Sequence, residues 1–536
     1  MKSEINNLKS EIRHIHFIGI CGVAMSALAI ALKEKGHVKL PDGSHVASHI
    51  VTGSDKGFYP PVSDNLKNAG VSFYPGWHPE KMGMPDLVVV GNVAGSQNPE
   101  WLAVREKKIP YLSYPEVIRE YLIRKNSIVC AGTYGKSTSS ALLAWILREA
   151  GYDPSYMFGG VSLNDMPAAF IGGGDTAFSF VISSEARGRV EKSFRATDSP
   201  QKDSSASLSA LGRIASVGMT NKNEWSIVEG DEYKTSGWDD GAKFLHYQPT
   251  HLLLSSVVWD HADVYETNDA YVQAFERLIT LLPNDGLLVL SAKVTHNYPH
   301  LATLSPCRVV TYGKTDDNDY QYSNIQLSMD GISFDMVHRG TTHHAESDQL
   351  GDYLADNFTG CFALCQEIGI PAEKILASIQ TFKSIKRRLE KRYADGVTVF
   401  DDIAHSPKKA EAVLRTLRTI ANGRIIAVFE PNTGNRFPES IPGYADAFRD
   451  ADTVIIPRLS TIKRDPNKPA PLDGNDLADV IRKTHPNVEH LDDDEALVTY
   501  ISSQTKKGDI VVFLGSHGFR GMIEALVEKL SSLHVS

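Results

Sequence analysis

Short apolar runs followed by longer segments with helical spacing define the first part of the chain. Residues 15–20, IHFIGI, have the length of a buried strand, and they lead through a glycine turn into a helix that Gly36 ends. A second strand is expected over residues 86–92, DLVVVGN. Because strands that alternate with helices usually pair in parallel, the pattern predicts an α/β unit with a parallel sheet.

The same alternation begins again near residue 125. A strand over 126–132 runs into a glycine turn and then a helix that Gly151 ends, and further strands follow within 252–265 and 286–292. Residues 184–226 interrupt this pattern, because they are rich in Ser, Lys and Arg and poor in large apolar residues. Such a composition is typical of a long mobile insertion.

A third α/β unit starts near Lys386. Its apolar runs each end in a loop rich in Gly, Pro, Ser or Asp, and helical segments such as 407–421 separate them. This arrangement favours a doubly wound sheet. The runs occupy residues 397–406, 424–432, 452–458 and 509–518.

Composition and charge narrow the classes of protein. The length of 536 residues suits about three or four domains, and the net charge of −10 argues against a nucleic-acid binder. The five cysteines form no CxxC pair, so we expect free thiols in a reducing compartment. No signal-peptide core and no run of ~18 apolar residues is present, so we expect a cytoplasmic protein without a membrane partner.

The strongest motif is AGTYGKSTSS at residues 131–140, which lies between a strand and a helix. Such a turn directs backbone N–H groups and a helix N-terminus at phosphate oxygens. Lys136 would then reach the β and γ phosphates, and Ser137 would place its hydroxyl on Mg²⁺. The strict P-loop pattern fails, because Cys130 stands where its first glycine belongs. The alternative is a chance glycine turn before a helix.

Two acidic segments of the second unit could complete a phosphate site. IVEGDEYKTS, residues 227–236, carries Glu229, Asp231 and Glu232 after a strand, and Glu229 is the candidate Mg²⁺ ligand. WDHADVY, residues 259–265, carries His261 between two aspartates, where it could contact a metal or a transferring phosphate. The alternatives are a solvated acidic loop and a structural histidine.

The first glycine turn, GICGVAM at residues 19–25, only partly resembles a dinucleotide fingerprint. Gly19 and Gly22 are present but the third glycine is missing, so an NAD site is weakly supported. A loop that receives a diphosphate at a helix N-terminus is the better interpretation. Ser54 and Asp55 follow at the distance where an acidic residue often contacts a ribose or base.

The third unit brings basic and acidic residues close together in sequence. Its segments 386–393 and 399–407 suit a nucleotide that a second domain covers, and the alternative is a surface ion-pair network. The residues concerned are Arg387, Arg388, Asp401, Asp402 and His405.

These motifs together resemble those of the Mur ligases, over roughly residues 13–530 apart from the insertion. GTYGKST is similar to the ATP loop of that family, usually written GTHGKTT. EGDEY resembles its acidic motif, Asp260-His261 its DH motif, and DDIAHSP its C-terminal motif. Segments such as TGSDKGFYPPVS and EGDEYKTSGWDDGAKFLHY resemble the branch that acts on a murein tripeptide.

The resemblance implies an α/β protein of three domains. Residues 1–123 would be a Rossmann-like domain for a UDP-sugar, 124–384 a P-loop-type ATPase domain with a parallel sheet, and 385–536 a doubly wound Rossmann-like domain that covers ATP and recognises an amine. The implied reaction joins the lactyl carboxylate of UDP-N-acetylmuramate to the tripeptide L-Ala-γ-D-Glu-meso-diaminopimelate. It uses ATP and Mg²⁺ and passes through an acyl phosphate.

Roles follow from the resemblance by matching position. The catalytic candidates are Lys136, Glu229 and His261, and the metal candidates are Ser137, Glu229 and His261. The ATP candidates are Gly132, Thr133, Gly135, Lys136, Ser137, Thr138, Asn357, Arg388, Asp402 and His405. The candidates for the UDP-sugar are Gly19, Cys21, Gly22, Ser54, Asp55 and His78.

Several positions depart from the family pattern. Tyr134 replaces the usual histidine of the ATP loop, and Ser256 and Val258 stand where an N-x-E pair would be. Tyr353 and Leu354 replace the His-Asn pair of the adenine motif, and Ser406 replaces a second histidine before Pro407. Two alternatives therefore remain open: a ligase for L-alanine, and a degenerate member that binds nucleotides as a sensor. The oligomeric state is also left open.

Overall fold

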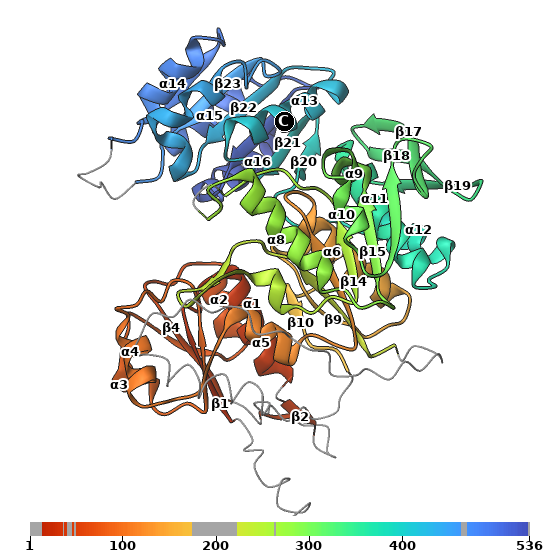
Figure 1. Cartoon of the computed structure of the whole chain (residues 1–536). Coiled ribbons are helices and arrows are strands. Elements are labelled where there is room, and N and C mark those ends of the chain that lie inside the picture. Colours follow the sequence, from red (N-terminus) through yellow and green to blue (C-terminus); the bar gives the residue numbers. More distant parts are fainter. Residues whose placement is uncertain are drawn as a thin grey trace, which may run out of the picture. The chain divides into compact units, whose positions relative to one another are not determined.

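The structure, a computed structural model, describes residues 13–35, 37–39, 45–47, 50–173, 222–261, 264–461 and 469–533. The chain divides into two compact units (Figure 1). The first comprises residues 1–322, 336–343 and 356–382, and the second comprises 323–335, 344–355 and 383–536. The insertion expected at 184–226 lies outside the described residues except for 222–226.

A five-stranded parallel sheet opens the first unit, in the order β5-β4-β1-β6-β7. Strand β6 is buried on both faces, because Leu87 and Val89 join one apolar cluster and Val88 and Val90 join another. The strands are β1 (His14–Ile18), β4 (Ile50–Asp55), β5 (Ser72–Pro75), β6 (Leu87–Val90) and β7 (Tyr111–Ser113), and the helices are α1 (Val23–Lys35), α2 (Val62–Asn68), α3 (Pro79–Met82), α4 (Pro99–Glu106) and α5 (Tyr114–Tyr121).

A ten-stranded sheet follows, in the order β10-β9-β11-β8-β14-β15-β16-β17-β18-β19. Strand β8 lies between β11 and β14 and is parallel to both, so the carboxyl ends of these three strands meet at one edge. The boundaries between the two units fall within β17, β18 and β19, near the start of α11, and after Phe382.

The strands of this sheet are β8 (Asn126–Ala131), β9 (Ser155–Met157), β10 (Ala169–Phe170), β11 (Trp225–Glu229), β14 (His251–Leu254), β15 (Leu287–Ser291), β16 (Arg308–Gly313), β17 (Tyr320–Ser328), β18 (Gly331–His338) and β19 (Thr341–Ser347). The helices that follow or precede them are α6 (Lys136–Glu149), α8 (Asn268–Thr280), α9 (Ala292–Asn297), α10 (His300–Thr303), α11 (Tyr353–Glu367) and α12 (Ala372–Thr381).

A short hairpin, β12 (Lys234–Ser236) and β13 (Asp239–Ala242), follows β11 and joins the ten-stranded part to the five-stranded part. Trp238 at its turn stacks on the ring of Trp101 in α4, with centroids 4.8 Å apart. The side-chain amide of Asn92 also donates to the carbonyl of Lys234 at 2.9 Å. The hairpin is thus fastened to the N-terminal sheet by a ring contact and a hydrogen bond.

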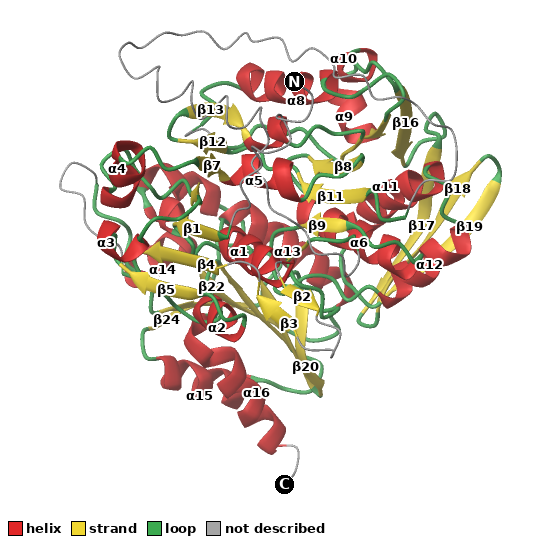
Figure 2. Cartoon of the chain, turned by 90° about the horizontal axis from the view of Figure 1, so that it is seen from below, coloured by secondary structure: helices red, strands yellow, loops and turns green. Residues whose placement is uncertain are grey.

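The second unit contains a six-stranded sheet in the order β20-β21-β25-β22-β23-β24, in which only β20 is antiparallel. Alternate residues of β22 join opposite apolar clusters, one with side chains of α13 and α14 and the other with side chains of α15 and α16. Figure 2 shows α15 and α16 together on one side of this sheet. The elements are β20 (Glu390–Asp395), β21 (Val397–Asp402), β22 (Ile425–Glu430), β23 (Thr453–Pro457), β24 (Val488–Leu491), β25 (Ile510–Gly515), α13 (Pro407–Ile420), α14 (Gly474–Arg482), α15 (Asp494–Gln504) and α16 (Met522–Leu533).

These observations confirm the predicted α/β fold with parallel sheets. Strand β14 ends at Leu254, so it is shorter than the strand expected within 252–265, and residues 255–261 form a loop. All five cysteines are free thiols, as expected. Among the described residues, no helix has both the length and the apolar character needed to cross a bilayer.

Candidate functional site

The turn between β8 and α6 depends on two glycines with positive φ angles, Gly132 at +133° and Gly135 at +83°. Other residues rarely adopt these conformations. The space beside each glycine is also filled. A Cβ at Gly132 would lie 2.5 Å from the Ser255 hydroxyl, and one at Gly135 would lie 2.5 Å from the Asn357 side-chain oxygen. The loop is therefore held closely between the segment after β14 and helix α11.

Lys136, the first residue of α6, folds back beneath this turn. Its ammonium donates to the carbonyl oxygen of Gly132 at 2.6 Å and forms an ion pair with Glu232, 2.9 Å away. The Glu232 side chain is almost fully buried. The ammonium is consequently fixed at the base of the turn.

Ser137 and Glu229 form a second pair beside the first. The hydroxyl of Ser137 donates to Oε1 of Glu229 at 2.7 Å, and the other carboxylate oxygen accepts from the backbone N–H of Gly159. The pair exists because β8 and β11 are neighbours that end at the same edge of the sheet. A hydroxyl and a carboxylate are hard oxygen donors, so this pair fits Mg²⁺. No cluster of three His, Cys, Asp or Glu side chains suited to a metal occurs in the described ranges.

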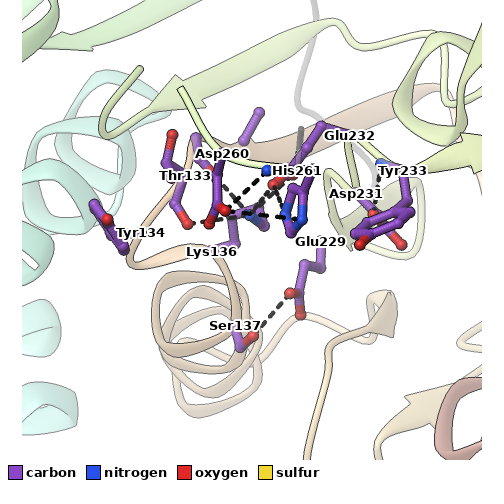
Figure 3. A network of polar contacts seen from close by, with 12 residues as sticks. Thr133, Tyr134, Lys136, Ser137, Glu229, Asp231, Glu232, Tyr233, Asp260 and His261 are labelled. Carbon is purple, nitrogen blue, oxygen red and sulfur yellow. Dashed lines mark hydrogen bonds and ion pairs between the residues drawn. The ribbon is translucent and has the colours of Figure 1, made fainter. Parts of the chain in front are cut away.

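His261 contacts Glu232. Its Nε2 lies 3.2 Å from Oε1 of Glu232, and the Tyr233 ring packs against the imidazole with centroids 4.3 Å apart. The hydrogen bond to Glu232 raises the pKa of His261, aided by Asp260 and opposed by partial burial and by Lys136. Figure 3 shows Lys136 and His261 converging on Glu232, while Ser137 lies toward Glu229. The three predicted metal ligands therefore divide between two neighbouring pairs.

Glu232 has a part in this site that the sequence did not indicate. Of the three clustered carboxylates, Asp231 pairs with Lys243 at 2.6 Å and Glu229 pairs with Ser137. Glu232 joins Lys136 to His261, two residues that belong to separate motifs. The only signal available was the density of acidic residues after β11.

Two of the residues that depart from the family pattern, Ser256 and Val258, contact the turn. The side-chain oxygen of Ser256 accepts from the backbone N–H of Tyr134 at 3.0 Å, and the Thr133 hydroxyl donates to the carbonyl of Val258 at 2.9 Å. Tyr134 itself is half exposed. Thr138 and Asn357 are buried, Thr138 on α6 and Asn357 on α11.

In the five-stranded part, the first glycine turn is closed by β4. Gly19 has a φ of +90° and its N–H donates to the carbonyl of Ser54, while the N–H of Cys21 donates to Oδ2 of Asp55 at 2.8 Å. Gly22 follows directly and begins the approach to α1. The turn predicted to hold a diphosphate is therefore fixed by the carbonyl of Ser54 and the carboxylate of Asp55.

The side chains predicted to hold the UDP-sugar differ in their exposure. The Ser54 hydroxyl is fully buried and donates to Glu100, so it supports the loop and is not available to a ligand. Asp55 likewise closes the turn through Cys21. His78, at the N-cap of α3, keeps its ring partly exposed and pairs with Glu80 at 3.1 Å.

The predicted nucleotide contacts of the second unit surround the end of β21. Asp402 is buried and accepts from the backbone N–H groups of Leu389 and Ala404 at 2.7 and 2.8 Å, and burial raises its pKa. Nδ1 of His405 lies 2.7 Å from the carbonyl of Ile403, and burial lowers the pKa of this histidine. Arg388 is exposed. Asp402 therefore shapes the loop, and Arg388 remains accessible to a ligand.

Comparison with known proteins assigns three parts of the chain to domains of one family. Residues 14–126 match the description "Mur ligase family, catalytic domain", residues 200–365 match "Mur ligase middle domain", and residues 387–517 match "Mur ligase, glutamate ligase domain". A UDP-N-acetylmuramate–L-alanine ligase of Mesorhizobium japonicum is 26% identical over 530 residues, covering 97% of this chain and 98% of its own length. The corresponding enzyme of Rhizobium meliloti is 28% identical over 528 residues and covers 97% of both chains.

Solved structures extend the similarity to the fold. A murein peptide ligase of Psychrobacter arcticus is 25% identical, with a TM-score of 0.62 over 97% of this chain and 98% of that one. A UDP-N-acetylmuramate–alanine ligase of Thermotoga maritima is 19% identical, with a TM-score of 0.71 over 97% of this chain and 100% of that one, and shows the fold alone. The chain belongs to the Mur ligase family and is an ATP-dependent, ADP-forming amide ligase.

Proposed function

We propose that this ligase joins the lactyl carboxylate of UDP-N-acetylmuramate to the amine of the tripeptide L-Ala-γ-D-Glu-meso-diaminopimelate, in peptidoglycan recycling in the bacterial cytoplasm. The observation that carries the phosphate chemistry is the meeting of two pairs at one sheet edge, Lys136 with Glu232 and Ser137 with Glu229. The choice of tripeptide is supported by the sequence segments shared with that branch. It is also supported by murein peptide ligase structures from Psychrobacter arcticus and Neisseria meningitides at 25% and 26% identity.

The reaction needs a carboxylate made reactive toward an amine. In the proposed first step a lactyl oxygen attacks the γ-phosphorus of ATP, and ADP leaves. The amine nitrogen then attacks the acyl carbon, the C–O bond to phosphate breaks, and the amine loses a proton. Because both partners of the first step are anions, positive charge near the phosphate lowers its barrier.

The residues of the chain supply that environment. Lys136 would neutralise charge on the β and γ phosphates, and the N–H groups of the turn around Gly135 would bind their oxygens. Glu232 would keep the side chains of Lys136 and His261 in position while ATP binds. Ser137 and Glu229 would hold Mg²⁺, which when bound would neutralise further phosphate charge.

Binding roles elsewhere follow the same proposal. The backbone of the turn containing Gly19, Cys21 and Gly22 would receive the diphosphate of the UDP-sugar, and Asp55 would fix the turn. The partly exposed ring of His78 would contact the same ligand. In the second unit, Arg388 would contact the nucleotide, and Asp402 and His405 would shape the loop that presents it.

The amine substrate is tested by phosphate release from ATP in the presence of UDP-N-acetylmuramate and Mg²⁺. We expect release with the tripeptide and little with free L-alanine. A second function, ligation of L-alanine, is favoured by the names of the curated relatives at 25–28% identity, and release driven by L-alanine would establish it. Silence with both amines, in protein that binds ADP, would instead support a nucleotide sensor.

The contact between His261 and Glu232 predicts a measurable titration. In protein without nucleotide, NMR should give His261 a pKa above its ordinary value of 6.5, because Glu232 stabilises the protonated ring. This pair would then contribute stability fully below pH 6.5 and lose it as pH rises through the folded pKa. Glu232→Gln should lower that pKa, and an unchanged value in the variant would contradict the assigned contact.

A further inference from the structure

Glu100 is a buried carboxylate of helix α4, and the sequence did not predict it as a site residue. It lies in the first turn of α4, where the side-chain oxygen of Asn98 caps the helix by accepting from the N–H groups of Glu100 and Trp101, both at 3.0 Å. The Glu100 side chain is 0% exposed. A charge in such a place is stable only when hydrogen bonds replace the water that it has lost.

Three separate segments supply those hydrogen bonds. Oε1 of Glu100 accepts from the Tyr74 hydroxyl at 2.7 Å and from the backbone N–H of His78 at 2.8 Å. Oε2 accepts from the Ser54 hydroxyl and lies 3.7 Å from Nε2 of His16. Burial alone would raise the pKa of Glu100, but the contacts with His16, Ser54, Tyr74 and His78 together lower it, so the group is a carboxylate at neutral pH.

The segments held by Glu100 are those that shape the proposed UDP-sugar subsite. The carbonyl of Ser54 accepts from the N–H groups of Gly19 and Ile20 at 2.9 and 3.1 Å, so Ser54 connects Glu100 to the glycine turn. The carbonyl of Asp55 accepts from the N–H of Gly76 at 2.8 Å, which ties the loop after β5 to the same strand end. One carboxylate therefore sets the glycine turn and the His78 loop at a fixed distance from each other.

We propose that Glu100 is a positioning residue for the UDP-sugar: it holds the turn after β1 and the loop carrying His78 in the arrangement that binds the UDP moiety. This inference rests on the proposed function of the N-terminal sheet. Glu100 lies inside the sheet–helix packing and acts through Ser54 and His78, so it is not a catalytic residue. Its loss should affect binding of the UDP-sugar more than binding of ATP, whose loop follows β8.

Glu100→Gln is the sharpest variant, because the amide has nearly the same shape. One of its two ends is an NH₂ group, which cannot accept from Ser54, Tyr74 or His78, so at least one buried donor loses its partner. We expect the Kd of UDP-N-acetylmuramate, measured by isothermal titration calorimetry, to rise about tenfold or more. The Kd of ADP should change less than about twofold. In steady state, the KM for the UDP-sugar should rise far more than kcat falls.

Glu116→Gln provides a matched control. Glu116 is also a first-turn carboxylate of the same sheet–helix part, and it accepts from the hydroxyl of Ser113 at 2.7 Å and from its N–H at 2.8 Å. Its hydrogen bonds are to Ser113 and not to the turn after β1 or the loop carrying His78, so any folding stability that its variant costs should come without selective loss of UDP-sugar affinity. Circular dichroism melts of both variants measure that cost.

The outcomes distinguish a failure of the positioning role of Glu100 from a failure of the proposed UDP-sugar subsite. Selective loss of UDP-sugar affinity in Glu100→Gln, with ADP affinity kept, supports the positioning role. Equal losses for both ligands, the same loss in Glu116→Gln, or unchanged affinity in folded Glu100→Gln would overturn it. If Glu100→Gln does not fold, Tyr74→Phe removes a single donor and is judged by the same comparison. Wild-type protein that fails to bind UDP-N-acetylmuramate but binds ADP would overturn the proposed subsite itself.

Discussion

Replacing Lys136 with alanine is expected to lower kcat by about 100-fold or more, while UDP-sugar binding stays close to wild type. The reason is that Lys136 is the ammonium fixed beneath the glycine turn, 2.6 Å from the Gly132 carbonyl, where a phosphate would take its charge. Phosphate release measures the rate, and calorimetry measures the affinity for UDP-N-acetylmuramate.

This variant also removes the partner of buried Glu232, so a loss of folding must be separated from a loss of catalysis. Lys136→Ala combined with Glu232→Gln avoids the unpaired carboxylate and should remain inactive. Lys125→Ala removes a half-exposed lysine that forms a 3.9 Å ion pair with Glu224, and it should keep full activity. A loss of only a few-fold in kcat for Lys136→Ala would contradict the proposal that this residue binds phosphate.

Replacing Glu229 with glutamine should reduce kcat/KM by about 100-fold and raise the Mg²⁺ concentration needed for half-maximal activity. The carboxylate that Ser137 and Gly159 orient becomes a neutral amide of similar shape, so the site keeps its volume but loses its charge. Titration of activity with Mg²⁺ measures the shift.

Glu224→Gln is the control for this second variant. Glu224 precedes the same strand, is 40% exposed and pairs with Lys125, so its charge lies on the surface. Its Mg²⁺ requirement should equal that of the wild type. If Glu229→Gln keeps the wild-type Mg²⁺ dependence, the metal does not use this carboxylate and the assignment of the Ser137–Glu229 pair is wrong.

The sequence predicted the parts of the fold whose strands are buried on both faces. Strands such as β8, β22 and β25 are continuous apolar runs, which are visible without any knowledge of their neighbours. Strands β17 to β19 were not predicted, because Gln, Ser, Asn, Thr and His occupy many of their positions and expose one side. The hairpin β12–β13 is short and polar, so it had no such signal either.

The candidate site was predictable where its residues are neighbours in sequence. The turn from Gly132 to Ser137 is one local motif, and its glycines are required by its own backbone conformation. Contacts between distant segments could not be read in this way. Glu232 contacts Lys136 across 96 positions, and Ser54 contacts Glu100 across 46, so neither contact was predicted.

The ring contact between Trp238 and Trp101 has a consequence for modular exchange within the family. The hairpin that carries Trp238 follows directly after Glu229 and Glu232, so one short segment of chain connects the candidate site with the N-terminal sheet. A chimaera that takes its N-terminal domain from a relative would keep this contact only where that domain carries a matching ring. Where the ring differs, exchanging the N-terminal domain therefore requires exchanging the hairpin as well, although residues 234–242 lie in the central part of the sequence.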